Sequence, residues 1–352
     1  MERLRRVGAH MGLAPEGASK LPTEPPAGGG QDLSYQEQHR RSLALLSSQA
    51  DPDAETWRTA APLVLSGEQR SFFATFGYLA LPGLLADRAA DIIRDFEEVW
   101  DSYGGGQDGK PHDGVNRSCI VPFFDSHPNL VSLIDDPRID GLATGLLGDE
   151  WNVMGSDGNY YAGDTQWHSD GGHARGDPMH IKIAFYLDTL TRDTGALRLI
   201  PGSHLFGDSY ADALNTVTAA SKLYEGHLAS DTKEAGISGR DVPAVAIETV
   251  EGRGDVVVFN HNCKHAAFGG SSKRRMFTIN LCQRYPAGKE HKLAEYLNGI
   301  ARFLVDHSYS EITLATATPK RMRRLQQVIE NDGHLAGLAR AAAAERGMAA
   351  RG

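Results

Sequence analysis

The segment "YYAGDTQWHSDGGHARGDPMHIKIAFYLD" (160–188) decides the fold, because in it a polar, glycine-containing stretch runs directly into an apolar run with strand character. Within the polar part, "WHSD" places His168 and Asp170 two positions apart. In an extended chain, residues i and i+2 point to the same face, so these two side chains can hold one ion. The segment therefore predicts a pair of metal ligands at the edge of a β region.

The β character extends on both sides of this segment, from about residue 150 to 285, as short apolar runs broken by Gly, Asp, Asn and Pro. Helical patterns between these runs are few, and only one connection, roughly 205–243, is long. This texture is typical of a sandwich or barrel and not of an alternating βα fold. Strands are expected at 151–157, 159–163, 179–188, 196–201, 245–250, 254–260 and 275–283.

Three regions are expected along the chain. Residues 1–61 are rich in Pro, Gly, Gln and Ser, which predicts a flexible or partly helical N-terminal arm. The main domain is expected over 62–290, and it opens with a helix from Ser66, a strand "YLAL" after Gly77, and a second helix. Residues 291–352 return to helical patterns and are expected to form a C-terminal extension.

Composition restricts the function classes. The net charge of -9 and the pI near 5.9 argue against a nucleic-acid surface. No apolar run approaches the roughly 20 residues that a membrane-spanning helix needs. The odd number of cysteines, far apart in the sequence, predicts reduced thiols in an intracellular, cytoplasmic protein. The partner expected is a small-molecule substrate, without nucleic acid or membrane, and a homo-oligomer stays open.

A third metal ligand has to come from elsewhere in the chain. The expected strand "GDVVVFN" (254–260) runs into "HNCKHAAFGG" (261–270), which offers His261 and His265. Two histidines and one carboxylate form the facial triad that binds non-haem Fe(II) and leaves three positions open. The tripeptide His-x-Asp is a weak signal alone, because short motifs of this kind arise often by chance.

Longer stretches resemble the phytanoyl-CoA dioxygenase family of Fe(II)- and 2-oxoglutarate-dependent oxygenases. They are "LSGEQRSFFATFGYLALPGLL" (65–85), "WHSD" (167–170), "AFYLDTLTRDTGALRLIPGSH" (184–204), "GDVVVFNHNCKHAAFGG" (254–270) and "KRRMFTINL" (273–281). The resemblance covers roughly 62–285 and implies a double-stranded β-helix, a cupin-like jelly roll. It also implies Fe(II), 2-oxoglutarate and O2 as cofactor and cosubstrates.

By position in the family pattern, His168, Asp170 and His265 match the metal ligands. His261 falls where the family carries a variable polar residue, and His204 closes the "PGSH" turn, where a structural role is expected. His173 and His180 are expected in a loop and on a strand surface. Ala267 departs from the family, because many members carry Ser or Thr there to help hold the cosubstrate.

The far carboxylate of 2-oxoglutarate needs a buried cation, and a guanidinium suits it. The resemblance implies an arginine near "KRRM", where Arg274 and Arg275 compete. Alternation along the strand favours Arg274, because the face with Arg275 and Phe277 looks like an outer face packed on helices. Weaker candidates for cosubstrate or substrate contacts are Asn116, Arg117, Tyr161 and Lys182. The long connection at 205–243 is a candidate lid.

The function implied by the resemblance is hydroxylation of a small metabolite, with release of succinate and CO2. Arg and Lys residues near the site favour an anionic substrate. Related halogenating enzymes carry a small residue where Asp170 stands, which favours oxygen insertion over halogenation. Two alternatives stay open. One is a cupin-like isomerase or ligand-binding barrel that binds metal without activating oxygen, and the other is a structural protein on an inactive barrel.

Overall fold

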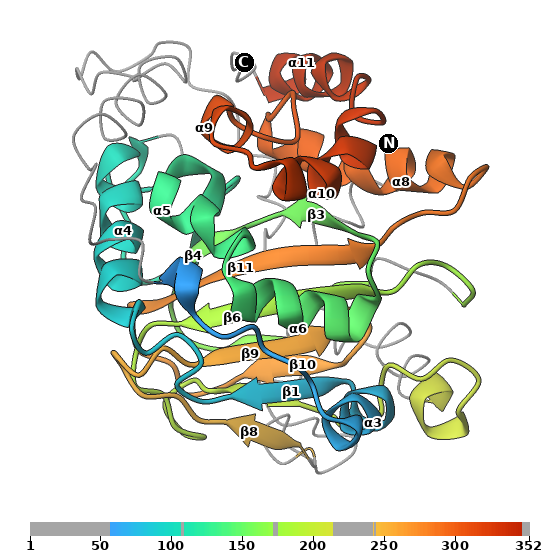
Figure 1. Cartoon of the computed structure of the whole chain (residues 1–352). Coiled ribbons are helices and arrows are strands. Elements are labelled where there is room, and N and C mark those ends of the chain that lie inside the picture. Colours follow the sequence, from blue (N-terminus) through green and yellow to red (C-terminus); the bar gives the residue numbers. More distant parts are fainter. Residues whose placement is uncertain (1–56, 107–108, 172–174, 214–241, 243, 347–352) are drawn as a thin grey trace.

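Two antiparallel sheets form the centre of the computed structural model, which describes residues 57–106, 109–171, 175–213, 242 and 244–346 (Figure 1). The first sheet has seven strands, in the order β1-β9-β6-β11-β4-β2, with β3 pairing to β11. Its strands are β1 (Tyr78–Leu81), β2 (Ser118–Ile120), β3 (Trp151–Gly155), β4 (Gly158–Tyr161), β6 (His180–Tyr186), β9 (Val256–Asn260) and β11 (Arg274–Gln283).

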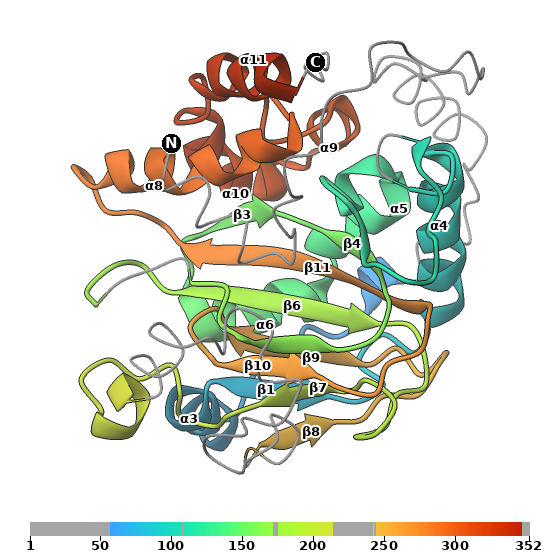
Figure 2. The ribbon, with the colours of Figure 1, turned by 180° about the vertical axis from the view of Figure 1, so that it is seen from behind.

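The second sheet has four strands in the order β5-β10-β7-β8. They are β5 (Thr165–His168), β7 (Leu197–Leu199), β8 (Val245–Ile247) and β10 (His265–Ala267). One apolar cluster joins the two sheets, because it combines Tyr186 and Phe259 of the large sheet with Leu197 and Leu199 of the small one. Figure 2 shows the small sheet in front of the large one. The expected mainly β fold, a double-stranded β-helix of jelly-roll type, is confirmed.

Helices cover the face of the large sheet that is turned away from the small one. The main core packs Phe277 and Ile279 of β11 against Phe96 of α4, Leu130 of α5 and Leu142 of α6. Figure 1 shows α6 lying across this face. The helices are α3 (Gly67–Phe76), α4 (Ala89–Ser102), α5 (Pro128–Val131), α6 (Pro137–Leu147), α8 (Glu290–Leu297), α9 (Glu311–Ala315), α10 (Pro319–Ile329) and α11 (Leu335–Arg346), with 3-10 turns η3 (Phe124–Ser126), η4 (Ser132–Ile134) and η6 (Asn298–Phe303).

The C-terminal helices lie along the β3 edge of the large sheet (Figure 1). Leu293 of α8, Leu325 of α10 and Leu335 of α11 are fully buried and belong to the same main core as the sheet. The division at residue 290 remains a prediction. None of the helices described is long and apolar enough to cross a membrane.

Local sequence signals account for the N-terminal elements. Ser66 and Gln69 form the expected capping box, in which Ser66 Oγ accepts from the Gln69 amide at 3.1 Å and Gln69 Oε1 from the Ser66 amide at 2.9 Å. Gly77 ends α3 at φ 84°, in the left-handed region that glycine tolerates. The seven strands expected between residues 150 and 285, and the strand after Gly77, are all present.

The short strands β5 and β10 were not among the strands expected from sequence. Each has only three or four residues, and β5 and β10 carry histidines and polar neighbours, so no apolar run marks them. They become strands by pairing with their neighbours in the small sheet, where β10 lies between β5 and β7. The expected arm falls almost wholly, and the expected lid mostly, outside the described residues.

Candidate functional site

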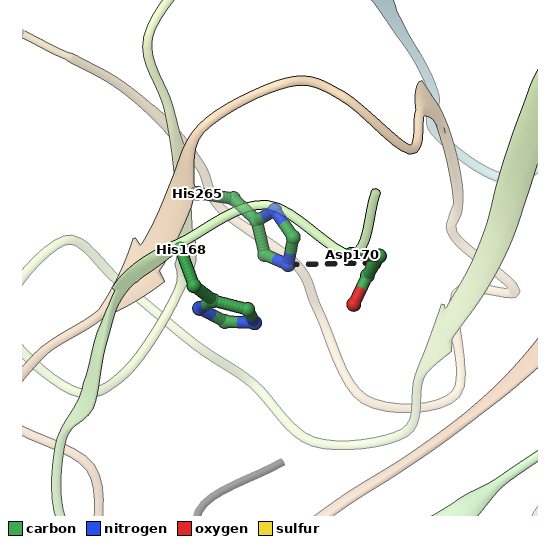
Figure 3. Close-up of side chains that lie close together, drawn as sticks. All are labelled: His168, Asp170 and His265. Carbon is green, nitrogen blue, oxygen red and sulfur yellow. Dashed lines mark ion pairs between the residues drawn. The ribbon is translucent and has the colours of Figure 1, made fainter. Parts of the chain in front are cut away.

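The expected metal ligands converge where β5 ends and β10 begins. His168 is the last residue of β5, His265 is the first of β10, and the two are direct partners in the antiparallel pairing. Their imidazole ring centroids lie 4.2 Å apart. Asp170 follows two residues after His168, and its Oδ2 lies 3.7 Å from His265 Nε2 (Figure 3). One ligand atom from each of the three residues lies within 4.8 Å of the others.

The protonation of these groups suits a divalent cation. His265 Nδ1 lies 3.0 Å from the Cys263 carbonyl oxygen, so it donates there and leaves the Nε2 lone pair directed toward Asp170. Burial lowers the pKa of His265, which keeps the imidazole neutral. Burial alone would raise the pKa of Asp170, but the Lys182 ammonium and the neighbouring histidines hold it well below its usual range. A neutral imidazole and an ionised carboxylate are the forms that bind a metal.

Lys182 of β6 contacts the carboxylate of this group directly. Its Nζ lies 2.8 Å from Asp170 Oδ2, and both side chains are largely buried. The register explains the placement, because Lys182 lies opposite Phe259 on β9 and Asn280 on β11, on the face of the large sheet turned toward the small sheet. Lys182 therefore lies beside the three expected metal ligands and contacts Asp170.

Arg274 is buried on this same inner face. It pairs in register with Tyr161 of β4, and its guanidinium carbon lies 5.1 Å from the centre of the Tyr161 ring. Only 2% of Arg274 is exposed, yet Nε and Nη1 have no hydrogen-bond partner within the part of the chain described. A Cβ added at Gly195 or Gly270 would come within 2.1 Å of Nη1, so these glycines make the space that the guanidinium occupies.

Arg275 points to the opposite side of β11. Its guanidinium nitrogens lie 2.6 Å from Asp188 Oδ1, 2.6 Å from Glu251 Oε1 and 3.1 Å from Glu97 Oε1. Three carboxylates thus hold Arg275 on the helix-covered side of the sheet. The alternation of β11 places the two adjacent arginines on different faces, with Arg274 inside.

Of the weaker candidates, Arg117 lies on the inner face and Asn116 does not. The guanidinium carbon of Arg117 also lies over the Tyr161 ring, 4.9 Å from the ring centre. Arg117 Nε donates to Asn159 Oδ1 at 2.8 Å. Arg117 is therefore on the inner face with Tyr161 and Arg274. Asn116 is exposed instead, with its amide nitrogen Nδ2 donating to Asp113 at 2.9 Å, and the structure does not bring it to the metal ligands.

The other histidines have different surroundings. His261 is 2% exposed and close enough to affect the Asp170 carboxylate, but it does not belong to the group of three converging ligands. His204 Nε2 lies 3.2 Å from the Ala74 carbonyl oxygen. The expectation that His180 lies on a strand surface is wrong: it is fully buried, 2.9 Å from the Tyr285 hydroxyl, because the C-terminal segment covers this end of β6. His173 lies outside the described residues.

Two polar residues beside the ligands escaped the sequence reasoning. Asp157 is buried and lies 3.5 Å from Arg117 Nη2 and 2.5 Å from the Thr278 hydroxyl. Lys264, next to a metal ligand, donates to Ser169 Oγ at 2.9 Å. Asp157 could have been found by counting back in steps of two from Tyr161 along the strand.

Comparisons with known proteins give the family of this chain. The family model "Phytanoyl-CoA dioxygenase (PhyH)" matches residues 73–277. Among solved structures, the non-haem α-ketoglutarate-dependent carbocyclase SnoK from nogalamycin biosynthesis is similar over 66% of this chain and 93% of its own, with 21% identity and a TM-score of 0.46.

Two further solved structures resemble this chain to a similar degree. EctD from S. alaskensis, with bound Fe, matches over 63% of this chain and 79% of its own, with 21% identity and a TM-score of 0.45. HygX from Streptomyces hygroscopicus, with nickel and 2-oxoglutarate bound, matches over 63% of this chain and 88% of its own, with 15% identity and a TM-score of 0.45. No curated protein sequence matched the chain.

Proposed function

This chain belongs to the phytanoyl-CoA dioxygenase (PhyH) family of non-haem Fe(II)- and 2-oxoglutarate-dependent oxygenases, and from that premise we propose that it hydroxylates a small, anionic metabolite. The proposal includes release of succinate and CO2 from 2-oxoglutarate. The observation that carries it is the convergence of His168, Asp170 and His265, whose ligand atoms lie within 4.8 Å of one another. Members of the family typically use Fe(II) and 2-oxoglutarate.

The donor set fits Fe(II) chemically. Two imidazoles and one carboxylate fill one face of an octahedral ion and leave three positions for cosubstrate and oxygen. Iron bound there would supply the oxidising power for breaking a C–H bond. The chain itself would hold the ligands ready. The Cys263 carbonyl fixes the tautomer of His265, and Lys182 fixes the orientation of the Asp170 carboxylate.

Arg274 would bind the far carboxylate of 2-oxoglutarate. A buried guanidinium, two of whose nitrogens have no hydrogen-bond partner in the described part of the chain, is suited to a bidentate carboxylate pair. Leaving those donors unpaired would cost free energy, so Arg274 is expected to bind an anion. This favours a 2-oxoglutarate-dependent oxygenase over a cupin-like isomerase or ligand-binding barrel, because neither alternative needs a buried site for a dicarboxylate. Ala267 cannot offer the hydroxyl that many family members use for the cosubstrate, so another polar group has to replace it.

The substrate class follows from the charges on the inner face. Lys182 of β6 contacts Asp170, and Arg117 and Arg274 both contact the ring of Tyr161. Cationic side chains in a buried setting favour a substrate with a carboxylate or phosphate group. We also propose a cytoplasmic location, which Cys119, Cys263 and Cys282 support as free thiols.

The test is turnover of 2-oxoglutarate to succinate by the full chain with Fe(II) and ascorbate, in the presence of a panel of small acids. We expect one acid to raise succinate formation and to gain one oxygen atom by mass spectrometry. Because Asp170 occupies the position that is open in halogenating relatives, adding chloride should change neither rate nor product. No succinate with any member of a broad panel, or a chlorinated product, would overturn the proposal.

A further inference from the structure

A second group of metal-ligand side chains lies far from the first, between α4 and α5. Asp95 and Glu98 are one helical turn apart on α4, and His127 directly precedes α5. One ligand atom from each lies within 4.8 Å of the others, the same criterion that the first group meets. The Asp95 and His127 residues have no exposed surface, whereas the Glu98 side chain is 32% exposed.

His127 lies between the two carboxylates of this group, and neither contact is as short as a charge-assisted hydrogen bond. His127 Nε2 lies 3.3 Å from Glu98 Oε2, and His127 Nδ1 lies 3.8 Å from Asp95 Oδ2. A charge-assisted pair closes to about 2.7–2.9 Å. Within the part of the chain described, neither imidazole nitrogen has a hydrogen-bond partner, and neither does Glu98 Oε2.

An imidazole binds a given ion through one nitrogen, so only one of these two distances can separate two ligands of that ion, and the 3.3 Å between His127 Nε2 and Glu98 Oε2 suits this role. Zinc bonds to imidazole and carboxylate are about 2.0–2.2 Å long, which separates two ligand atoms by roughly 3–3.5 Å. His265 and Asp170 of the first group show a similar separation, 3.7 Å. The second group thus has one pair of atoms at the spacing of two metal ligands, with an atom of Asp95 in reach of the same ion.

Neighbouring side chains fix the second group as an outer layer fixes metal ligands. Arg94 donates to Asp95 Oδ1 through Nε at 3.1 Å and Nη2 at 2.8 Å. Asn129 Nδ2 donates to Asp95 Oδ2 at 2.5 Å. The carboxylate is therefore held in place whether or not an ion is bound, and the partly exposed Glu98 leaves an entry path from the surface.

We propose that Asp95, Glu98 and His127 bind a divalent transition metal ion, Zn(II) in the first instance, that ties α4 to α5 over the main core. One imidazole and two carboxylates suit Zn(II), and water would complete its coordination. This site is separate from the one assigned to catalysis and does not depend on the proposed function. Its effect is on stability, because an ion that binds only the folded chain stabilises it.

The experiment uses the full chain with His168 and His265 both changed to Ala, so that the first group cannot bind metal. Isothermal titration with Zn(II) alone should then show one remaining site. Adding Glu98→Gln should weaken it by at least about 10–100-fold, since one of three ligands loses its charge. Adding Asp101→Asn instead, which removes an exposed carboxylate from the same helix, should leave the affinity unchanged.

A second measurement keeps the proposal testable if a variant folds poorly. Zinc-edge X-ray absorption of the double Ala variant should show one imidazole and only oxygen or nitrogen ligands. Failure of the double Ala variant to bind Zn(II), unchanged affinity in Glu98→Gln, or sulfur ligation would each overturn the proposal.

Discussion

At the scale of single residues, the adjacent arginines of β11 differ because strand alternation sends them into different environments. Arg274 enters the interior, where glycines at 195 and 270 leave it room and two of its nitrogens find no hydrogen-bond acceptor among the residues that the structure describes. Arg275 meets Asp188, Glu97 and Glu251 outside. An unsatisfied buried guanidinium is costly unless a ligand completes it, whereas a saturated one is structural.

Replacing Arg274 with Gln should weaken 2-oxoglutarate binding while leaving Fe(II) binding intact. A buried charge-assisted pair lost from one side costs about 2–5 kcal/mol, so the Kd for 2-oxoglutarate should rise at least about 30-fold. Titration of the Fe(II)-loaded protein measures this. Arg275→Gln is the matched control and should leave the Kd within about threefold. The reverse order of effects would show that the cosubstrate lies on the other face.

The metal triad gives a second prediction. His168→Ala or His265→Ala should abolish the visible absorption band that Fe(II) and 2-oxoglutarate produce together, because two remaining ligands hold the ion too weakly. Anaerobic titration followed by absorption tests it. His261→Ala, a buried histidine outside the group of three, should keep the band. A full band in His265→Ala would transfer the third ligand to another residue.

Lys264 gives a prediction about pH. Burial lowers its pKa to about 8, whereas the unfolded chain keeps it near its ordinary value of about 10.4. Between those pH values the unfolded state holds more protons, so the Lys264 contribution makes stability rise with pH. At pH 7 the buried charge is a cost, and Lys264→Met should therefore stabilise the fold by about 1–3 kcal/mol.

Urea unfolding of the wild-type chain and Lys264→Met at pH 7 and pH 10 isolates this contribution from other titrating groups. The difference in unfolding free energy should be large at pH 7 and close to zero at pH 10. A difference that stays constant across this range would mean that Lys264 does not titrate within it.

At the scale of elements, the C-terminal end of α3 packs tightly against residues that lie next to β7 and β10 of the small sheet. Gly77 ends α3 and its amide donates to the Phe73 carbonyl. Its Cα faces Cys263 Sγ and His204 Nδ1 so closely that a Cβ would lie 2.3 and 2.5 Å from them. The turn thus needs glycine twice, for its positive φ and for space.

Gly77→Ala should destabilise the protein by about 2–5 kcal/mol, since it combines left-handed strain with an overpacked contact. Thermal or urea unfolding measures the loss. Gly67→Ala, at the first position of the same helix with nothing within 4 Å, should leave stability unchanged or raise it by up to about 1 kcal/mol. Equal effects of the two changes would contradict the role given to Gly77.

At the scale of the whole molecule, the C-terminal helices are built into the core of the β region. Leu325 and Val328 of α10 are fully buried in the same cluster as Ile279 and Leu281 of β11. The Tyr309 hydroxyl also bonds the Val153 carbonyl of β3. A shared core of this kind predicts that the helices and the sheets unfold together.

Leu325→Ala should therefore lower the stability of the entire chain by about 2–5 kcal/mol. Urea unfolding should remain one transition when followed both by circular dichroism, which reports the helices and strands together, and by tryptophan fluorescence, which includes Trp167 of β5. Ile329→Ala, on the same helix but 38% exposed, should cost about 1 kcal/mol or less. Two separate transitions would instead favour an independent C-terminal extension.

The sequence alone determined what depends on neighbouring residues. The capping box at Ser66, the turn at Gly77 and the alternation of β11 are all local, because hydrogen bonds and side-chain directions there follow from positions a few residues apart. The resemblance to the family indicated which residues are the expected metal ligands. The structure brings these residues together, although His168 and His265 are 97 positions apart in the sequence.

Only the tertiary structure decided which distant groups meet. The pairing of β5 with β10 unites the histidines, and no local periodicity marks either short strand. The burial of His180 and the contact of Lys182 with Asp170 depend on what covers each face of β6. His127 reaches α4 only because α5 packs beside it. Such contacts come from the packing of elements far apart in the chain, so a single sequence carries no local signal for them.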